Sequence, residues 1–241
     1  MSDADRTAQL LGLVIDRSPR PLDELVAEVG AGEPEVRAAL EALERHGLIE
    51  WDADGTVGDG PRLRFARSGE GRRQLAELAE PAMRRLADES GETVNLMVRT
   101  PQGAEAVAQA DGRHVLGASN WIGRPVPNHC SAAGKVFLAF GPAGPSGPLE
   151  ALTARTIVHP DQLARDLEQV RARGFATIVD ELEMGLAAVA APIRDGAGTV
   201  VGALSVAGPT ARLGPSRLGI VGRLAIEQAD GVSARLGYAR G

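Results

Sequence analysis

The sequence predicts an α+β protein with an N-terminal winged helix-turn-helix, a helical linker, and a C-terminal antiparallel sheet covered by helices. Three observations predict this class. Short apolar stripes at helical spacing fill the first 47 residues, separated by proline and glycine. A longer helical pattern runs from Gly69 to Ser90, and after Gly91 the period changes to that of strands. We therefore expect three parts, at residues 1–67, 68–90 and 91–241.

The first part divides into three helices and a hairpin. The break Ser18–Pro21 ends the first helix, Gly30 the second and Gly47 the third. The apolar stripes of these helices are Leu11, Val14 and Ile15; Leu22, Leu25, Val26 and Val29; and Val36, Leu40 and Leu43. Two extended segments at 48–51 and 63–65, joined by the turn 52–55, complete a winged helix.

The linker carries Leu75, Leu78, Ala82 and Leu86 in helical register. Pro81 lies within this pattern, and proline removes one hydrogen bond of a helix interior. We therefore expect either a kink or two helices that meet there.

The third part begins with strands at 93–99, 104–110 and 113–118. A helix that begins at Ser131 follows, and then a helix from Pro160 to Arg173 that ends at Gly174. Buried strands at 187–193 and 200–206 and a closing helix at 215–236 complete the pattern. This order is typical of an antiparallel sheet covered by helices.

The helix that begins at Ser131 opens with small residues. Its first backbone N–H groups lack partners within the helix, and Ala132, Ala133 and Gly134 leave them uncovered. Ser131 can cap one of these donors, and a small anion can reach the others. The alternative is that Ala-Ala-Gly allows close packing against a sheet.

Composition excludes several classes of protein. Of 241 residues, 44% are hydrophobic and 24% charged, as in a globular protein, and neither a membrane span nor an export signal is expected. The single cysteine, Cys130, excludes an internal disulfide and favours a cytoplasmic location. Its neighbour His129 suggests a nucleophile and base, but adjacent side chains rarely face each other. The four histidines lack metal-ligand spacing, so we expect no metal and no cofactor.

Charge is distributed unevenly along the chain. Residues 1–67 hold eight arginines against fourteen acidic residues, so the whole net charge of −6 lies there. An acidic domain is the reverse of the usual footprint of a DNA-binding domain.

In order and spacing, a series of motifs resembles the IclR (isocitrate lyase regulator) family of bacterial transcription factors. The motifs include Ser90-Gly91-Glu92-Thr93-x-Asn95-Leu96, His129-Cys130-Ser131-Ala132-Ala133-Gly134-Lys135, Asp180-Glu181 with Gly185-Leu186, Ala190-Ala191-Pro192-Ile193, and Ala203-Leu204-Ser205-Val206-x-Gly208-Pro209. The resemblance implies a winged helix that binds double-stranded operator DNA within a homodimer or homotetramer. It also implies a GAF-like effector-binding domain at 91–241.

The same resemblance implies where the effector binds. The backbone amides of Ser131, Ala132 and Ala133 would hold its carboxylate, and we include the preceding His129 among the contacts. Ile178 and Ala188 stand where relatives that bind small oxo-acids have an aspartate and a cysteine, while Ser205 keeps a hydroxyl. The hypothesis is a carboxylic acid with an apolar or aromatic body, larger than glyoxylate or pyruvate.

The DNA-binding end departs from the family pattern. Glu33, Pro34 and Glu35 replace the usual basic or hydroxylic start of the recognition helix, and Ala38 replaces an arginine. The remaining candidates for DNA contact are Arg37, Arg62, Arg64 and Arg67, whose guanidinium groups suit guanine or phosphate. The alternatives are that these arginines only form a solvated face, or that the chain is a ligand-binding or scaffold protein that has lost operator recognition.

Overall fold

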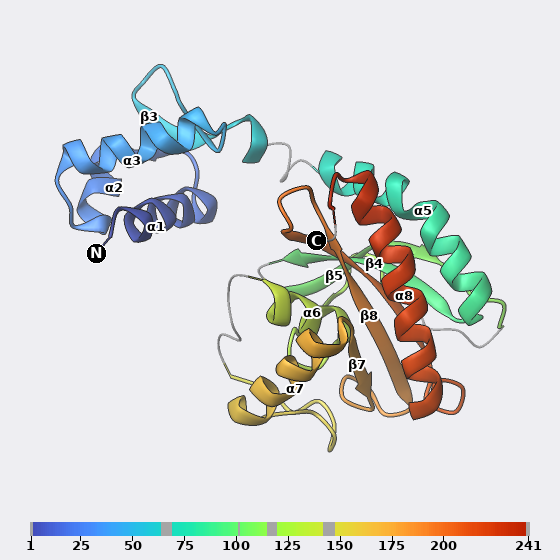
Figure 1. The fold of residues 1–241 in the computed structure, drawn as a ribbon. Helices are drawn as coiled ribbons and strands as arrows, with labels where there is room; N and C mark the ends of the chain where they lie inside the picture. The colour runs from blue at the N-terminus through green and yellow to red at the C-terminus, as the bar shows by residue number, and fades with distance from the viewer. Residues whose placement is uncertain (1, 64–68, 101, 115–119, 142–147, 240–241) are drawn as a thin grey trace. The chain divides into compact units, whose positions relative to one another are not determined.

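The computed structural model describes residues 2–63, 69–100, 102–114, 120–141 and 148–239. The chain forms two compact units, Met1–Arg73 and Gln74–Gly241. Figure 1 shows the course of the chain through both.

The N-terminal unit is a winged helix-turn-helix. Its elements are α1 (Asp3–Asp16), β1 (Arg20–Pro21), α2 (Leu22–Val29), α3 (Glu33–Arg45), β2 (Ile49–Trp51) and β3 (Thr56–Asp59). Gly30 ends α2 with a left-handed backbone (φ 65°) and so allows the turn into α3. A core of nine buried residues joins the helices to the hairpin: Leu10, Val14, Leu25, Val29, Val36, Leu40, Leu43, Ile49 and Val57.

The second strand of the wing was predicted in the wrong place. Residues 56–59, which form β3, pair with β2 and also with β1. Residues 61–63 are helical, and 64–65 lie outside the described residues. Gly60 follows β3 where a Cβ atom would lie 2.6 Å from the carbonyl oxygen of Gly47. Strand β3 was missed in the sequence because glycine, which has a low strand propensity, lies within it and directly after it.

Helix α5 (Glu70–Ser90) includes Pro81, so of the two alternatives, a kink or two helices that meet there, the second was wrong. Its apolar face belongs to the core of the C-terminal unit, through Leu75, Ala79, Met83 and Leu86.

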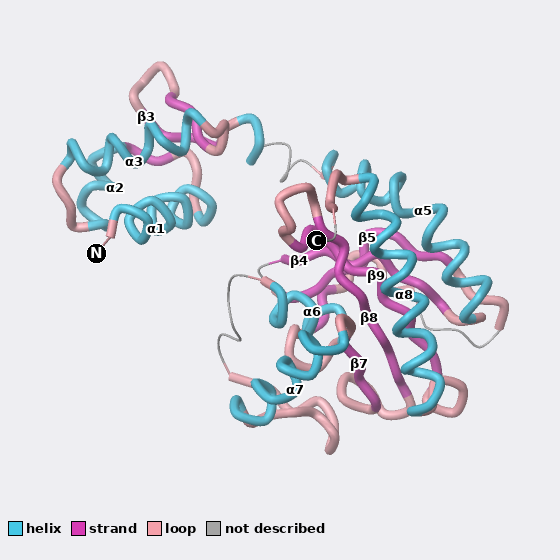
Figure 2. Tube along the Cα trace, viewed as in Figure 1, coloured by secondary structure: helices cyan, strands magenta, loops and turns pink. Residues whose placement is uncertain are grey.

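The C-terminal unit is built on a six-stranded antiparallel sheet with the order β6-β5-β4-β9-β8-β7 (Figure 2). The strands are β4 (Thr93–Thr100), β5 (Gly103–Ala110), β6 (Pro125–Val126), β7 (Ala176–Val179), β8 (Leu186–Arg194) and β9 (Val200–Pro209). β7 was not predicted. The strand predicted at 113–118 is not found at 113–114, and the rest of it lies outside the described residues.

Helices cover both faces of this sheet. Helices α5 and α8 (Pro215–Arg235) pack on the face that carries Val94, Leu96 and Val206. Helices α6 (Ala132–Phe140) and α7 (Pro160–Arg173) pack on the other. That second face is rich in alanine, including Ala188 and Ala203. Small side chains let α6 approach the strands closely, which places the start of α6 over the middle of the sheet.

Candidate functional site

The start of α6 keeps two backbone donors free. Ser131 is the N-cap, and its Oγ accepts from the N–H of Gly134 (3.2 Å) and donates to the carbonyl of Pro127 (2.7 Å). The N–H groups of Ala132 and Ala133, at the first two helical positions, make no hydrogen bond within the described part of the chain. The first turn therefore offers two donors and the positive end of the helix dipole to an anion.

Gly134 has a different role from its alanine neighbours. A Cβ atom there would lie 2.3 Å from the Cα and 2.5 Å from the carbonyl oxygen of Asn128. Gly134 thus lets the preceding loop pack against the helix, whereas the packing interpretation placed this close contact at the sheet. The motif therefore combines close packing, at Gly134, with free backbone donors, at Ala132 and Ala133.

A cavity of about 40 Å³ lies between α6 and the sheet, and its space corresponds to about three water molecules. Its wall combines the start of α6 with side chains from β4, β9, β8 and the end of β7. The lining residues are Asn95, Met97, Trp121, Val126, Ser131, Ala132, Ala133, Ile178, Leu182, Leu186, Ala188, Ser205 and Ala207. The described part of this wall is mostly apolar and contains no charged side chain.

The structure brings most of the predicted effector contacts together. Ser131, Ala132, Ala133, Ile178, Ala188 and Ser205 all line the cavity. His129 does not: it is buried, and its Nε2 lies 2.9 Å from the carbonyl oxygen of Glu150. That contact ties the loop before α6 to the segment before α7.

Sequence reasoning missed Asn95 as a cavity residue. Asn95 on β4 is directly opposite Ser205 on β9, so both side chains stand on the α6 face of the sheet. Asn95 is 3% exposed, and its Oδ1 is buried with no hydrogen-bond partner among the described residues. The signal available in the sequence was an amide within the apolar strand that includes Val94 and Leu96.

A buried charge cluster lies beneath α6. The Nζ of Lys135, which is fully buried, donates to Glu181 Oε1 at 2.8 Å and forms an ion pair with Asp166 Oδ2 at 2.8 Å. The cluster joins α6, α7 and the turn after β7. That turn is fixed further by Thr153 and Thr156, whose hydroxyls donate to the carbonyls of Asp180 and Glu181. Burial raises the pKa of Glu181, against the lowering effect of Lys135.

The pair His129 and Cys130 is not arranged for catalysis. Cys130 is fully buried, and burial raises the pKa of its thiol to about 11, with Glu181 adding to the shift. The ring of His129 contacts Glu150 instead. Among the described residues, no group of three or more histidine, cysteine, aspartate or glutamate side chains is arranged to hold a metal ion.

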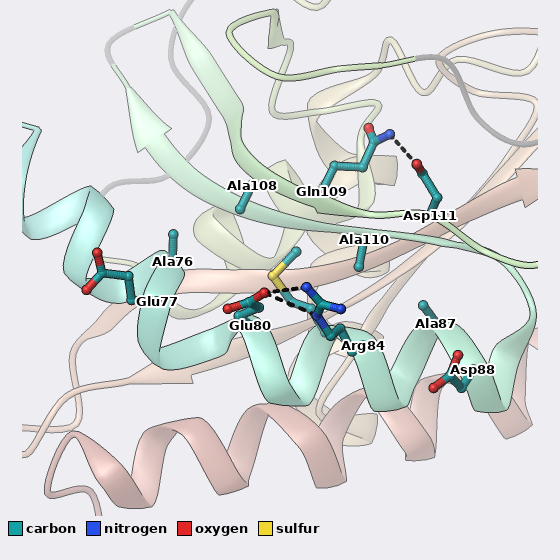
Figure 3. A pocket seen from close by; sticks show the side chains of 11 residues that line it. Ala76, Glu77, Glu80, Arg84, Ala87, Asp88, Ala108, Gln109, Ala110 and Asp111 are labelled. Carbon is teal, nitrogen blue, oxygen red and sulfur yellow. Dashed lines mark hydrogen bonds and ion pairs between the residues drawn. The ribbon is translucent and has the colours of Figure 1, made fainter.

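A larger hollow, of about 570 Å³, opens between α5 and β5 (Figure 3). Alanines from both elements form part of its wall, and Arg84 is held by Glu80 at 2.7 Å. Four carboxylates surround it: Glu77, Glu80, Asp88 and Asp111. Because like charges repel, this hollow is unsuited to an anionic ligand.

In the N-terminal unit, the acidic start of α3 is engaged within the chain. Glu33 forms an ion pair with Arg37 at 3.0 Å, and Glu35 accepts from the N–H of Gly32 at 3.2 Å. Arg6 on α1 lies 3.8 Å from Glu35. These carboxylates therefore stabilise the helix start, where its dipole favours negative charge.

The predicted DNA contacts are only partly described. Arg37 is exposed on α3, and its guanidinium lies 5.4 Å from the centre of the Trp51 ring on the wing. Arg62 is exposed directly after the wing. Arg64 and Arg67 lie outside the described residues. No helix in the described ranges is both long enough and apolar enough to cross a membrane.

Comparisons with known proteins agree with this architecture. The family model of the bacterial transcriptional regulator IclR C-terminal domain matches residues 71–234. The HTH-type transcriptional regulator BhcR of Paracoccus denitrificans is 32% identical over 239 residues, which cover 95% of this chain and 85% of that protein. The glycerol operon regulatory protein of Streptomyces coelicolor is 34% identical over 222 residues, or 87% and 85% of the two chains.

A solved structure is similar in fold. The crystal structure of the Thermotoga maritima IclR has a TM-score of 0.65 and 22% identity, covering 98% of both chains. The relatives are transcriptional regulators, not enzymes. With the family model matched over most of its length, this chain belongs to the IclR family of bacterial transcriptional regulators.

Proposed function

We propose that this regulator binds double-stranded operator DNA through its winged helix, as a homodimer or homotetramer, under the control of a small carboxylic acid. The acid binds at the start of α6. The observation that carries this proposal is the pair of free N–H groups at Ala132 and Ala133, two residues in the wall of a mostly apolar cavity.

The apolar wall favours an acid with an apolar body. Ile178 and Ala188 offer contact area and no hydrogen bond, so they reward burial of CH groups. A space of about 40 Å³ holds a carboxylate and few further atoms. A larger or aromatic body therefore requires the half-buried side chains of Trp121, Leu182 or Leu186 to move.

DNA contact is assigned to the exposed side of α3 and the region after the wing, through Arg37, Arg62, Arg64 and Arg67. The intrachain partners of Glu33 and Glu35 support this assignment, because they reduce the repulsion between α3 and phosphates. The ligand signal would reach the winged helix through α5, which begins near the boundary of the two units.

The first test is fluorescence anisotropy of the full chain on DNA from upstream of its own gene, beside unrelated DNA, over a range of salt concentrations. A preference for one sequence and a steep loss of affinity with salt are expected. Absence of binding even at low salt would reject the proposal and favour a ligand-binding or scaffold role.

A variant tests whether the acid site is separate from the DNA site. Ala133→Leu should fill the start of α6 and abolish the response to carboxylic acids, with DNA affinity unchanged. Ala154→Leu is the matched control, since Ala154 is exposed outside the cavity wall. Loss of DNA binding in folded Ala133→Leu, but not in the control, would contradict a separate effector site.

A further inference from the structure

We infer that the effector carries a second polar group, a hydroxyl or an amide, which hydrogen-bonds to Asn95 and Ser205. This inference rests on the proposed function and adds to it the chemistry of the far end of the ligand. The effector is then a short acid with two polar ends and an apolar middle.

The first observation is an unmet hydrogen-bonding capacity in the cavity wall. Asn95 is 3% exposed and Ser205 is 7% exposed, and both line the cavity. Oδ1 of Asn95 is buried without a partner, and neither side chain makes a hydrogen bond within the described part of the chain. Buried polar groups are nearly always paired, so an amide without a partner at a cavity points to a missing one.

The second observation is the position of the two side chains. They are cross-strand partners on β4 and β9, so they form one polar patch rather than two separate contacts. A side-chain amide offers both a donor and an acceptor, and a serine hydroxyl does the same. A single hydroxyl or amide on the ligand can therefore bond to both residues.

The remaining wall restricts where polar groups of the ligand can lie. Ser131 already bonds to Pro127 and Gly134 through its hydroxyl. The other polar side chains of the wall, within the described ranges, are Asn95, Ser205 and the indole of Trp121. The N–H groups of Ala132 and Ala133 take the carboxylate. The second polar group then belongs at the patch on the sheet, and the small space between them limits the connecting chain to a few carbons.

This arrangement predicts that the site discriminates between a hydroxy acid and the same acid without the hydroxyl, which an entirely apolar site would not do. A site with groups placed to bond a hydroxyl rejects the analogue without it, because its own polar atoms are then left unpaired. Asn95 is on this basis a specificity-determining residue of the effector site.

The test is titration calorimetry of the full chain with three matched pairs of acids: acetate and glycolate, propionate and 3-hydroxypropionate, and butyrate and 4-hydroxybutyrate. Within at least one pair, the hydroxy acid should bind about tenfold more tightly. Asn95→Leu should remove this preference, and Ser205→Ala should weaken it. The control variant Ala154→Leu, which lies outside the cavity wall, should keep the wild-type preference for the hydroxy acid.

Thermal unfolding separates a specificity role from a structural one. Leucine has a similar size and needs no partner, so Asn95→Leu should keep or raise the melting temperature of the free protein. If Asn95→Leu fails to fold or melts well below the wild type, Asn95 has a structural role. If, in that case, Ser205→Ala also keeps the preference for the hydroxy acid, the inference is wrong. Equal affinity within every pair would refute the inference while leaving the carboxylate site in place. No binding of any acid would reject the proposed function itself.

Discussion

Replacement of Lys135 by methionine should destabilise the C-terminal unit strongly at neutral pH. Lys135 is fully buried and is the cation between Asp166 and Glu181, whose side chains are 21% and 12% exposed. Methionine keeps the length of the chain but leaves two carboxylates in one poorly solvated space. Breaking a buried ion pair by removing one partner costs about 3–5 kcal/mol.

The size of this effect should depend on pH, because a carboxylate left without its cation can take up a proton. Without Lys135, the buried site can take up a proton on Glu181, whose ordinary pKa is 4.5. Holding that proton at pH 7 costs about 1.4 kcal/mol per pH unit above 4.5, or about 3.4 kcal/mol, and at pH 5 about 0.7 kcal/mol. For a unit of this size, each kcal/mol lowers the melting temperature by roughly 2–4 °C. Lys135→Met should therefore lower it by about 10 °C at pH 7 and by about 2 °C at pH 5.

Thermal unfolding followed by circular dichroism at the two pH values is the assay. The triple variant Lys135→Met/Asp166→Asn/Glu181→Gln is the control, and it should recover most of the loss because no buried charge remains. A Lys135→Met protein that melts within about 2 °C of the wild type at pH 7 would refute the reasoning.

Three further outcomes follow from the buried ionisable groups. Because burial raises the folded-state pKa of Glu181, its contribution to stability is full below pH 4.5 and is lost as pH rises through the folded pKa, so Glu181→Gln should flatten the acid side of the pH–stability curve. Urea unfolding at a series of pH values checks this prediction. An unchanged dependence of the free energy of unfolding on pH would contradict it. Cys130, with its pKa at about 11, should react with iodoacetamide at pH 8 at least about a hundredfold more slowly in the native protein than in denaturing urea; similar rates would mean that the thiol is accessible. Arg212→Met should cost about 3 kcal/mol in urea unfolding, because the fully buried carboxylate of Glu92 loses two hydrogen bonds of 2.6 Å, and a cost below about 1 kcal/mol would contradict that role.

Local signals in the sequence were enough to predict elements whose ends are marked by proline or glycine. The helix Pro160–Arg173 was predicted to the residue, since proline favours its first turn and Gly174 ends it with a left-handed backbone of φ 82°. Strand β7 escaped because it has only four residues between Gly174 and a turn. Among the described strands it pairs with β8 alone, which lies further along the chain.

The candidate site was predictable only in part. The free donors at the start of α6 follow from backbone geometry, which the small residues of the motif revealed. Asn95 and the partners of Lys135 depend on contacts between distant segments: Lys135 and Glu181 are 46 residues apart in sequence. No local pattern specifies such pairs, because the sheet register and the packing of α6 bring them together.

The order of strands in the sheet has a consequence for synthesis of the protein. Among the described residues, the core of the N-terminal unit ends at Val57, so this unit can fold while the rest of the chain is still being translated. In contrast, β4 lies between β5 and β9, so it cannot complete its pairing until β9 has been made. Glu92, directly before β4, likewise pairs with Arg212, which is 120 residues later. At about 5–20 residues per second, the ribosome needs roughly 6–24 s to cover that interval. During this time the apolar side chains of β4 in the nascent chain lack β9, so the C-terminal unit leaves apolar surface exposed during translation for longer than the winged helix does.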